Sequence, residues 1–158
     1  MPKNSITIPN YKTLTIRHIV LDYNGTLAKD GLLKEKAKAL LEKLSENYVV
    51  HVITADTFGS VDTQVSAYNV TVKVISSKDH TQEKSNYVET LGAESCIAVG
   101  NGNNDQLMLK NAAIGIALMG DEGCSTKTML ASDLVCKSIE DALGLCLNTK
   151  RLIATLRQ

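Results

Sequence analysis

The chain has 158 residues, with 17 basic and 17 acidic side chains and no Trp. A chain of this length forms one domain and buries roughly 68–70% of its unfolded surface, so it needs no disulfide or structural metal. The balanced charge argues against nucleic-acid binding, and no stretch approaches the ~20 apolar residues of a membrane span. We therefore expect a soluble protein with neither kind of partner.

The cysteines lie far apart and form no C-x-x-C pair, which predicts buried, reduced thiols. Residues 1–8 contain no apolar run of the length that a signal peptide requires. Both observations favour a cytoplasmic location. The four cysteines are Cys96, Cys124, Cys136 and Cys146.

Along the chain, two short alternating runs come first, at 5–8 and 13–16, and predict a β-hairpin. The next run, His18–Asp22, is apolar on both faces and ends in a carboxylate, as expected of a buried parallel strand. Apolar residues at a helical spacing then predict a helix over 34–47, and a second apolar strand follows over 48–54.

Helices and strands alternate through the rest of the chain, which predicts a mostly parallel sheet covered on both faces. We expect a Rossmann-like α/β fold of three layers, α/β/α, with five or six strands. It would form a single domain, 1–158, comprising an N-terminal hairpin (1–17), a core (18–147) and a C-terminal tail (148–158). The predicted helices span 59–67, 82–91, 105–111, 126–131 and 139–147, and the strands 70–75, 95–99, 114–118 and 134–136.

Ligands of such sheets bind beyond the carboxyl ends of the strands, where Asp22 lies. Gly25 and Thr26 follow it in a turn that can aim backbone N–H groups at an anion. A carboxylate beside an anion cradle suggests a divalent cation between them, so that the carboxylate can attack phosphorus. The alternative is that Asp22 only caps an ordinary turn.

Further polar candidates occur at Thr54, at Lys84 and in the loop 100–105. The hydroxyl of Thr54 can donate to a phosphoryl oxygen, although strands also end in Thr merely to cap the next helix. The ammonium of Lys84 can neutralise Asp22 and a phosphate, and Lys78 is a rival for this role. The loop, GNGNND, is too rich in Gly and Asn for a simple turn and predicts a metal or phosphate loop.

These elements, in this order, resemble the four motifs of the haloacid dehalogenase superfamily. Its first motif, D-x-D-x-[T/V]-L, is similar to DYNGTL at 22–27. Its second motif, a Ser or Thr at a strand end, matches Thr54; its third, a Lys, is best matched by Lys84; and its acidic fourth motif matches 100–105. The resemblance covers residues 22–147.

Within the superfamily the chain resembles the phosphorylation domain of P-type ATPases. The segment ITAD at 53–56 is similar to their T-G-D, GNGNND at 100–105 to their G-D-G-x-N-D, and AIGIALMG at 113–120 to their I-G-I-A-M-G. The chain contains no membrane segments and no nucleotide-binding insert, so it looks like a soluble branch of this type.

The resemblance implies a Mg²⁺-dependent phosphohydrolase that forms an aspartyl-phosphate on Asp22. The catalytic residues would be Asp22, Thr54 and Lys84, with Gly25 and Ala55 also binding phosphate. The metal ligands would come from Asp22, the carbonyl of Asn24, Asn101 and Asp105.

Two asparagines depart from the family pattern. Asn24 stands where the phosphatases place a general acid/base Asp, and an amide cannot carry a proton to a leaving alcohol. Asn101 stands where the family supplies a metal-binding Asp, so Mg²⁺ affinity should fall. Asp22 and Thr54 are 32 positions apart, and Thr54 and Lys84 are 30 positions apart, so no cap domain fits.

We therefore expect activity on small phosphorylated substrates or phosphoproteins with good leaving groups, including slow ATPase or acyl-phosphatase activity. One alternative is a catalytically silent protein that binds phosphate or a partner. Another is a capless sugar-phosphate phosphatase, a homo-tetramer whose neighbouring subunits close the site.

Overall fold

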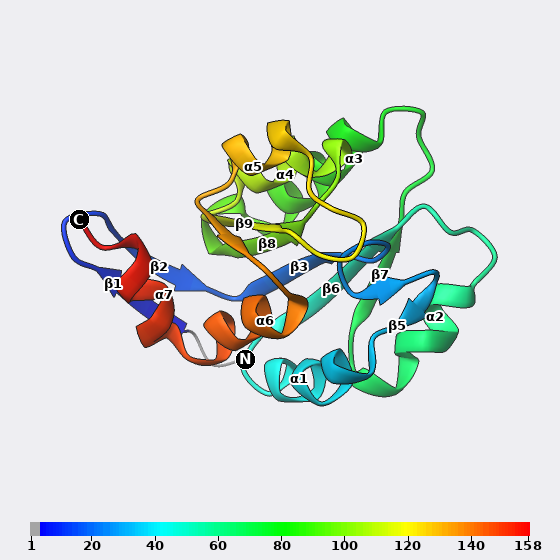
Figure 1. Cartoon of the computed structure of the whole chain (residues 1–158), viewed down its shortest axis with the longest axis horizontal. Helices are drawn as coiled ribbons and strands as arrows, with labels where there is room; N and C mark the ends of the chain where they lie inside the picture. Colours follow the sequence, from blue (N-terminus) through cyan, green and yellow to red (C-terminus); the bar gives the residue numbers. More distant parts are fainter. Residues whose placement is uncertain (1–3) are drawn as a thin grey trace.

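The computed structural model describes residues 4–158, which are organised around a six-stranded parallel sheet (Figure 1). The strand order is β10-β9-β8-β3-β6-β7. This confirms the predicted Rossmann-like sheet, in which β3 occupies a central position between β6 and β8. The strands are β3 (His18–Asp22), β6 (Val49–Thr54), β7 (Thr71–Val74), β8 (Cys96–Gly100), β9 (Ile114–Leu118) and β10 (Leu134–Cys136).

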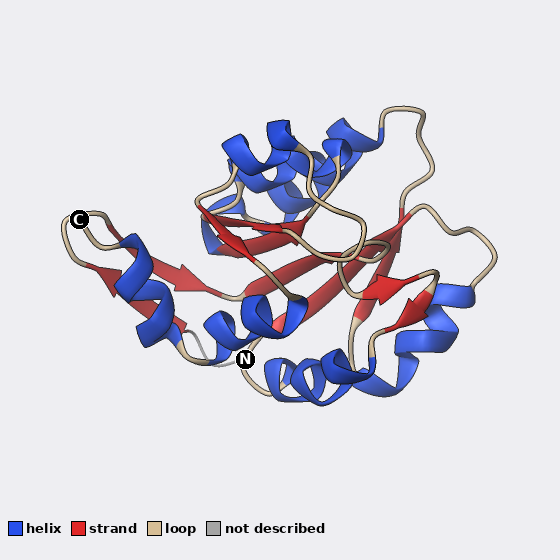
Figure 2. Ribbon diagram, in the orientation of Figure 1, coloured by secondary structure: helices blue, strands red, loops and turns tan. Residues whose placement is uncertain are grey.

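Helices cover both faces of the sheet, as Figure 2 shows. The alternating side chains of β3 explain this, since Ile19 and Leu21 join one apolar cluster and Val20 joins the other. The first cluster is covered by α1 (Glu35–Ser45) and α6 (Ile139–Leu147), and the second by α3 (His80–Leu91) and α4 (Gln106–Asn111). Two shorter helices complete the layers, α2 (Ser60–Val65) and α5 (Thr126–Ala131).

The predicted N-terminal hairpin is present as β1 (Asn4–Ile8) and β2 (Lys12–Ile16); residues 1–3 lie outside the described part. Residues 148–158, assigned from the sequence to a C-terminal tail, are not without secondary structure. They contain a helix, α7 (Thr149–Leu156), that packs against β1 (Figure 1). Its Leu152 is fully buried in the main apolar cluster, so burial against the hairpin stabilises this short helix.

A second small hairpin, β4 (Ala28–Lys29) and β5 (Leu32–Leu33), follows β3 and was not predicted. It is too short to enclose a substrate by itself. Residues 4–158 contain no inserted cap domain, as expected. Within the same residues, no helix is long and apolar enough to cross a membrane.

All four cysteines are free; Cys124 is half-buried and the other three are buried, close to the expectation.

Candidate active site

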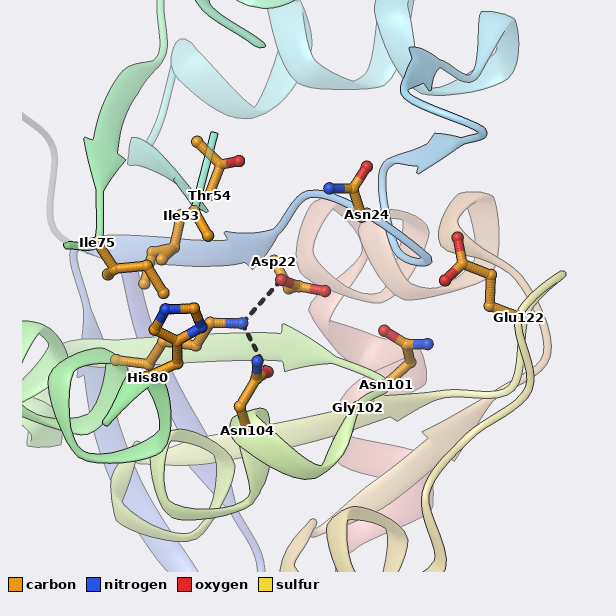
Figure 3. A pocket seen from close by; sticks show the side chains of 12 residues that line it. Asp22, Asn24, Ile53, Thr54, Ile75, His80, Asn101, Gly102, Asn104 and Glu122 are labelled. Carbon is orange, nitrogen blue, oxygen red and sulfur yellow. Dashed lines mark hydrogen bonds and ion pairs between the residues drawn. The ribbon is translucent and has the colours of Figure 1, made fainter. Parts of the chain in front are cut away.

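A pocket of about 230 Å³ opens at the carboxyl ends of β3 and β6, beside the loop that follows β8 (Figure 3). This is where the strand-end rule for parallel sheets places a ligand. Several of the predicted residues line it together. The lining residues are Asp22, Asn24, Ile53, Thr54, Ala55, Ile75, His80, Lys84, Asn101, Gly102, Asn104 and Glu122.

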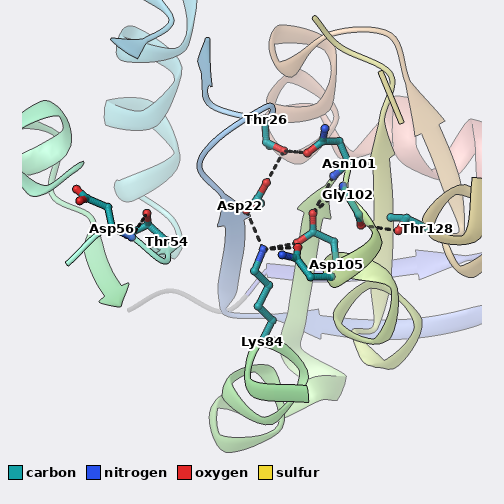
Figure 4. A network of polar contacts seen from close by, with 10 residues as sticks. Asp22, Thr26, Thr54, Asp56, Lys84, Asn101, Gly102, Asp105 and Thr128 are labelled. Atoms are coloured by element: carbon teal, nitrogen blue, oxygen red, sulfur yellow. Dashed lines mark hydrogen bonds and ion pairs between the residues drawn. The ribbon is translucent and has the colours of Figure 1, made fainter. Parts of the chain in front are cut away.

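Lys84 is the electrostatic centre of this pocket (Figure 4). It lies in the first turns of α3, is only 3% exposed, and its Nζ donates to three oxygens. These are Oδ1 of Asp22 at 2.9 Å, Oδ1 of Asp105 at 2.8 Å and Oδ1 of Asn104 at 2.9 Å. Lys78, the rival candidate, is exposed in the segment before α3. The geometry therefore favours Lys84 as the lysine that pairs with Asp22.

Asp105 lies behind Lys84 and does not line the pocket. Its side chain is fully buried, and its Oδ2 accepts the backbone N–H groups of Asn101 and Gly102, each at 3.0 Å. A Cβ on Gly100 would approach Cγ of Asp105 to 2.4 Å, so glycine is needed there. Because Asp105 is fully buried and does not line the pocket, this arrangement argues against the predicted metal-ligand role. It makes Asp105 a residue that positions Lys84 and the loop.

Asp22 is a buried carboxylate with a strongly altered acidity. Burial and then the nearby charge of Asp105 raise its pKa to about 7, while Lys84 and Thr26 oppose this shift. Its Oδ2 accepts only one hydrogen bond among the described residues, from Thr26 at 3.3 Å. Additional positive charge would therefore favour the ionised form that a nucleophile requires.

The donors around Asp22 suit a hard cation. A carboxylate oxygen of Asp22, an amide oxygen of Asn101 and the backbone carbonyl of Asn24 are of the kinds that Mg²⁺ binds. Residues 4–158 contain no group of three acidic, His or Cys side chains arranged to hold a metal. The residues present thus fit Mg²⁺ chemically, but with less negative charge than a site with two or more carboxylates.

Thr54 and Ala55 line the pocket beside Asp22. The Thr54 side chain is buried, and its Oγ1 accepts the backbone N–H of Asp56 at 3.0 Å. This bond closes a local turn and does not cap α2, whose N-cap is Gly59. It leaves the hydroxyl proton of Thr54 free to donate into the pocket. Asp56 turns away to cap the loop that begins α2, where its carboxylate accepts from the backbone of Phe58 and Val61.

Gly25 was predicted to bind phosphate, but its N–H donates to the carbonyl of Ala28 at 3.1 Å and it does not line the pocket. Its φ of +79° favours glycine, and an added Cβ would lie 2.7 Å from Nδ2 of Asn101. Gly25 therefore permits close packing of the first turn against Asn101, and the structure gives no support to direct contact with an anion.

Four residues near Asp22 were missed from the sequence: Thr26 as a hydrogen-bond donor to Asp22, and His80, Asn104 and Glu122 as pocket residues. Asn104 belongs to the loop that the motif identified. His80 begins α3 one turn before Lys84, so helical spacing could have indicated it. Nothing in the sequence around Glu122 points to the pocket.

The fold and this strand-end pocket indicate a structural class of proteins. The chain has the fold of the haloacid dehalogenase superfamily, because solved structures of its hydrolases superpose on nearly the whole chain. The 3-deoxy-D-manno-octulosonate 8-phosphate phosphatase of Moraxella catarrhalis, solved with magnesium, phosphate and the sugar, has a TM-score of 0.70 at 18% identity, covering 90% of this chain and 94% of that chain. The cobalt-bound enzyme of Haemophilus influenzae has the same TM-score and coverage at 11% identity. A phosphoserine phosphatase has a TM-score of 0.65 at 14% identity, covering 82% of this chain and 98% of that chain.

Sequence relatives are two uncharacterized proteins of Methanocaldococcus jannaschii. One is 62% identical over 61 residues, which are 39% of this chain and 66% of that protein. The other is 46% identical over 39 residues, 25% of this chain and 89% of that protein. The chain belongs to the same family as this second archaeal protein. No protein-family model matches the chain.

Proposed function

We propose that the protein is a Mg²⁺-dependent phosphohydrolase that works through an aspartyl-phosphate on Asp22. The observation that supports this most is the pairing of Asp22 with the buried ammonium of Lys84 at the floor of a strand-end pocket. A buried Lys with three oxygen partners is costly to build and adds no packing that an apolar residue could not supply. Its placement is explained if it neutralises a transferring phosphoryl group.

In this mechanism an oxygen of Asp22 attacks phosphorus, and the bond from phosphorus to the leaving oxygen breaks. Lys84 and the hydroxyl of Thr54 stabilise the phosphoryl oxygens, while Asp105 and Asn104 hold Lys84 in place. Mg²⁺, when bound at Asp22, Asn24 and Asn101, supplies charge neutralisation between carboxylate and phosphoryl group. Water then cleaves the acyl phosphate and regenerates the carboxylate.

Substrate preference follows from Asn24, which lines the pocket where a proton carrier would be needed. An amide cannot protonate a leaving alkoxide, so aryl phosphates, acyl phosphates and nucleotides should react faster than alkyl phosphates. This preference agrees with the resemblance to P-type ATPase domains, which predicts slow ATPase or acyl-phosphatase activity.

The test is hydrolysis of an aryl phosphate with Mg²⁺ and with EDTA, beside the Asp22→Asn variant. We expect turnover that requires both Mg²⁺ and Asp22, and acid-stable, hydroxylamine-labile labelling by radioactive acetyl phosphate. Phosphate binding without turnover or labelling would instead favour the silent phosphate-binding protein.

A second candidate is a capless phosphatase of sugar-acid phosphates. Its support is the superposition on two octulosonate 8-phosphate phosphatases over 90% of this chain. The pocket has no inserted domain over it within residues 4–158, so neighbouring subunits of a homo-oligomer would have to close it. A tetrameric mass in solution, together with higher kcat/KM for sugar phosphates than for aryl phosphates, would establish this candidate over the first.

A further inference from the structure

A carboxylate that the proposed reaction has not used lines the same pocket. Glu122 lies in the loop between β9 and α5 and is among the residues that form the pocket wall. Of the pocket's lining residues, only Asp22 and Glu122 carry carboxylates. Asp22 ends β3 and Glu122 lies in a loop 100 positions further along the chain, so no sequence motif connects them.

The loop that carries Glu122 is fastened to Asn101. The Nδ2 of Asn101 donates to the carbonyl of Gly123 at 3.2 Å, and the N–H of Ser125 donates to the carbonyl of Asn101 at 2.8 Å. A further bond within the loop, from the N–H of Gly123 to the carbonyl of Gly120 at 3.0 Å, fixes the turn that contains Glu122. Asn101 therefore helps to hold Glu122 at the pocket, together with the ion pair between Asp121 and Lys34 in the same loop.

This arrangement gives a reason for an amide at position 101. Its Oδ1 accepts from Thr26 at 3.4 Å while its Nδ2 donates to Gly123, and a carboxylate cannot make the second bond. An Asp at 101 would face the carbonyl of Gly123 and weaken the attachment of the loop. The negative charge that Asn101 lacks is present on Glu122, the residue before Gly123.

The position of Glu122 relative to Asp22 is also suitable. Figure 3 shows Glu122 on the side of Asp22 where Asn24 and Asn101 lie, and His80 on the opposite side. That opposite side already holds the ammonium of Lys84, which Asp22 and Asp105 neutralise. The region between Asp22, Asn24 and Asn101 contains carbonyl and amide oxygens but lacks a second negative charge.

We propose that Glu122 supplies this second charge as a ligand of the divalent cation, bound directly or through one of its waters. The inference rests on the proposed function, because it concerns the cation that Asp22 and Asn24 would bind. Mg²⁺ retains several waters and needs only one or two carboxylates, so an exposed side chain at the pocket wall can serve. The metal site would thus combine a buried nucleophile with a carboxylate from a different loop.

The experiment measures Mn²⁺ binding to the full chain by electron paramagnetic resonance, with Mg²⁺ as competitor and no substrate. The test variant is Glu122→Gln. The matched control is Asp121→Asn, which removes the same charge one residue away, where the carboxylate pairs with Lys34 at 3.1 Å instead of lining the pocket. The variant Asp22→Asn tests the metal site itself.

We expect Glu122→Gln to raise the Kd for Mn²⁺ by roughly 10-fold or more, as loss of a supporting carboxylate does in metal sites. Asp121→Asn should change it by about twofold at most, because exposed charges are screened. Adding Asn101→Asp to Glu122→Gln should recover part of the lost affinity, since it returns a carboxylate to the same cation.

If wild type binds Mn²⁺ in a way that depends on Asp22 while Glu122→Gln matches the control, this inference is wrong and the proposed function stands. If wild type binds no Mn²⁺, or if Asp22→Asn binds it equally well, the metal-dependent function itself fails.

Discussion

Replacing Lys84 by Met tests how much the ion pairs of Lys84 with Asp22 and Asp105 stabilise the folded protein. The substitution retains most of the volume of the side chain and removes the ammonium that contacts Asp22, Asp105 and Asn104 at 2.8–2.9 Å. It leaves two carboxylates without their shared cation, and the more deeply buried one, Asp105, is fully inaccessible to water. Breaking a buried ion pair by removing one partner costs about 3–5 kcal/mol.

The pH dependence of this cost has a definite sign. Because the folded protein raises the pKa of Asp22 from 3.8 to about 7, the folded state binds this proton more tightly than the unfolded state does. The contribution of Asp22 to stability is therefore greatest below pH 3.8 and is lost as the pH rises through 7. Lys84 lowers this pKa, so Lys84→Met should raise it further. At pH 8 the variant loses both pairings, whereas at pH 5.5 Asp22 is neutral and mainly the pairing with Asp105 is lost.

The assay is urea unfolding of the metal-free protein at both pH values. We expect Lys84→Met to lower the free energy of unfolding by about 3–5 kcal/mol at pH 8, and by less at pH 5.5. Lys78→Met is the control, since this exposed lysine should change stability by no more than about 0.5 kcal/mol. A folded Lys84→Met protein that loses under about 1 kcal/mol at pH 8 would refute the electrostatic account of the pocket.

Three further predictions concern the proton carrier, the packing of α4 and a second buried titrating group. Asn24→Asp should raise turnover of an alkyl phosphate by up to ~10²-fold and that of an aryl phosphate far less; equal gains would contradict the leaving-group argument. Gly115→Ala should lower the free energy of unfolding by about 1–3 kcal/mol, because its Cβ would lie 2.2 Å from the carbonyl oxygen of Leu109; an unchanged urea midpoint would show that α4 shifts freely. Burial, and then His18, lower the pKa of His51 to about 4, so the contribution of His51 to stability is lost as the pH falls from 6.5 towards 4. The Asp22→Asn variant removes the opposing pH dependence of Asp22, so in this background the melting temperature should fall between pH 7 and pH 5. Adding His51→Gln should flatten that profile.

The alternation of strands and helices was predictable because each element has a local signature. His18–Asp22 is apolar on both faces, and Ile114–Leu118 and Ile139–Leu147 begin and end where the pattern placed them. The helix Thr149–Leu156 was missed because its eight residues gain their stability from burial of Leu152 against the hairpin. That contact joins the two ends of the chain, and no window of sequence reveals it.

The pocket was predictable where residues lie at strand ends or helix starts. Asp22 and Thr54 end adjacent parallel strands, so their proximity follows from the sheet, and Lys84 follows from the start of α3. The separate roles of Asp105 and Asn101 could not be inferred, because they depend on which oxygens accept which hydrogen bonds. Glu122 could not be inferred either, since only the tertiary attachment of its loop brings it to the pocket.

Asn101 connects these observations. From the sequence, Asn101 looked like the loss of a metal ligand, since a neutral amide replaces a charged carboxylate. In the structure its two amide atoms link Thr26, which donates a hydrogen bond to Asp22, to Gly123, which follows Glu122. An Asp at this position would gain charge beside Asp22 and lose the donor that holds the loop. The amide is therefore consistent with a site whose second carboxylate comes from the β9–α5 loop, and the affinity of Asn101→Asp for Mg²⁺ alone should improve less than the added charge would suggest.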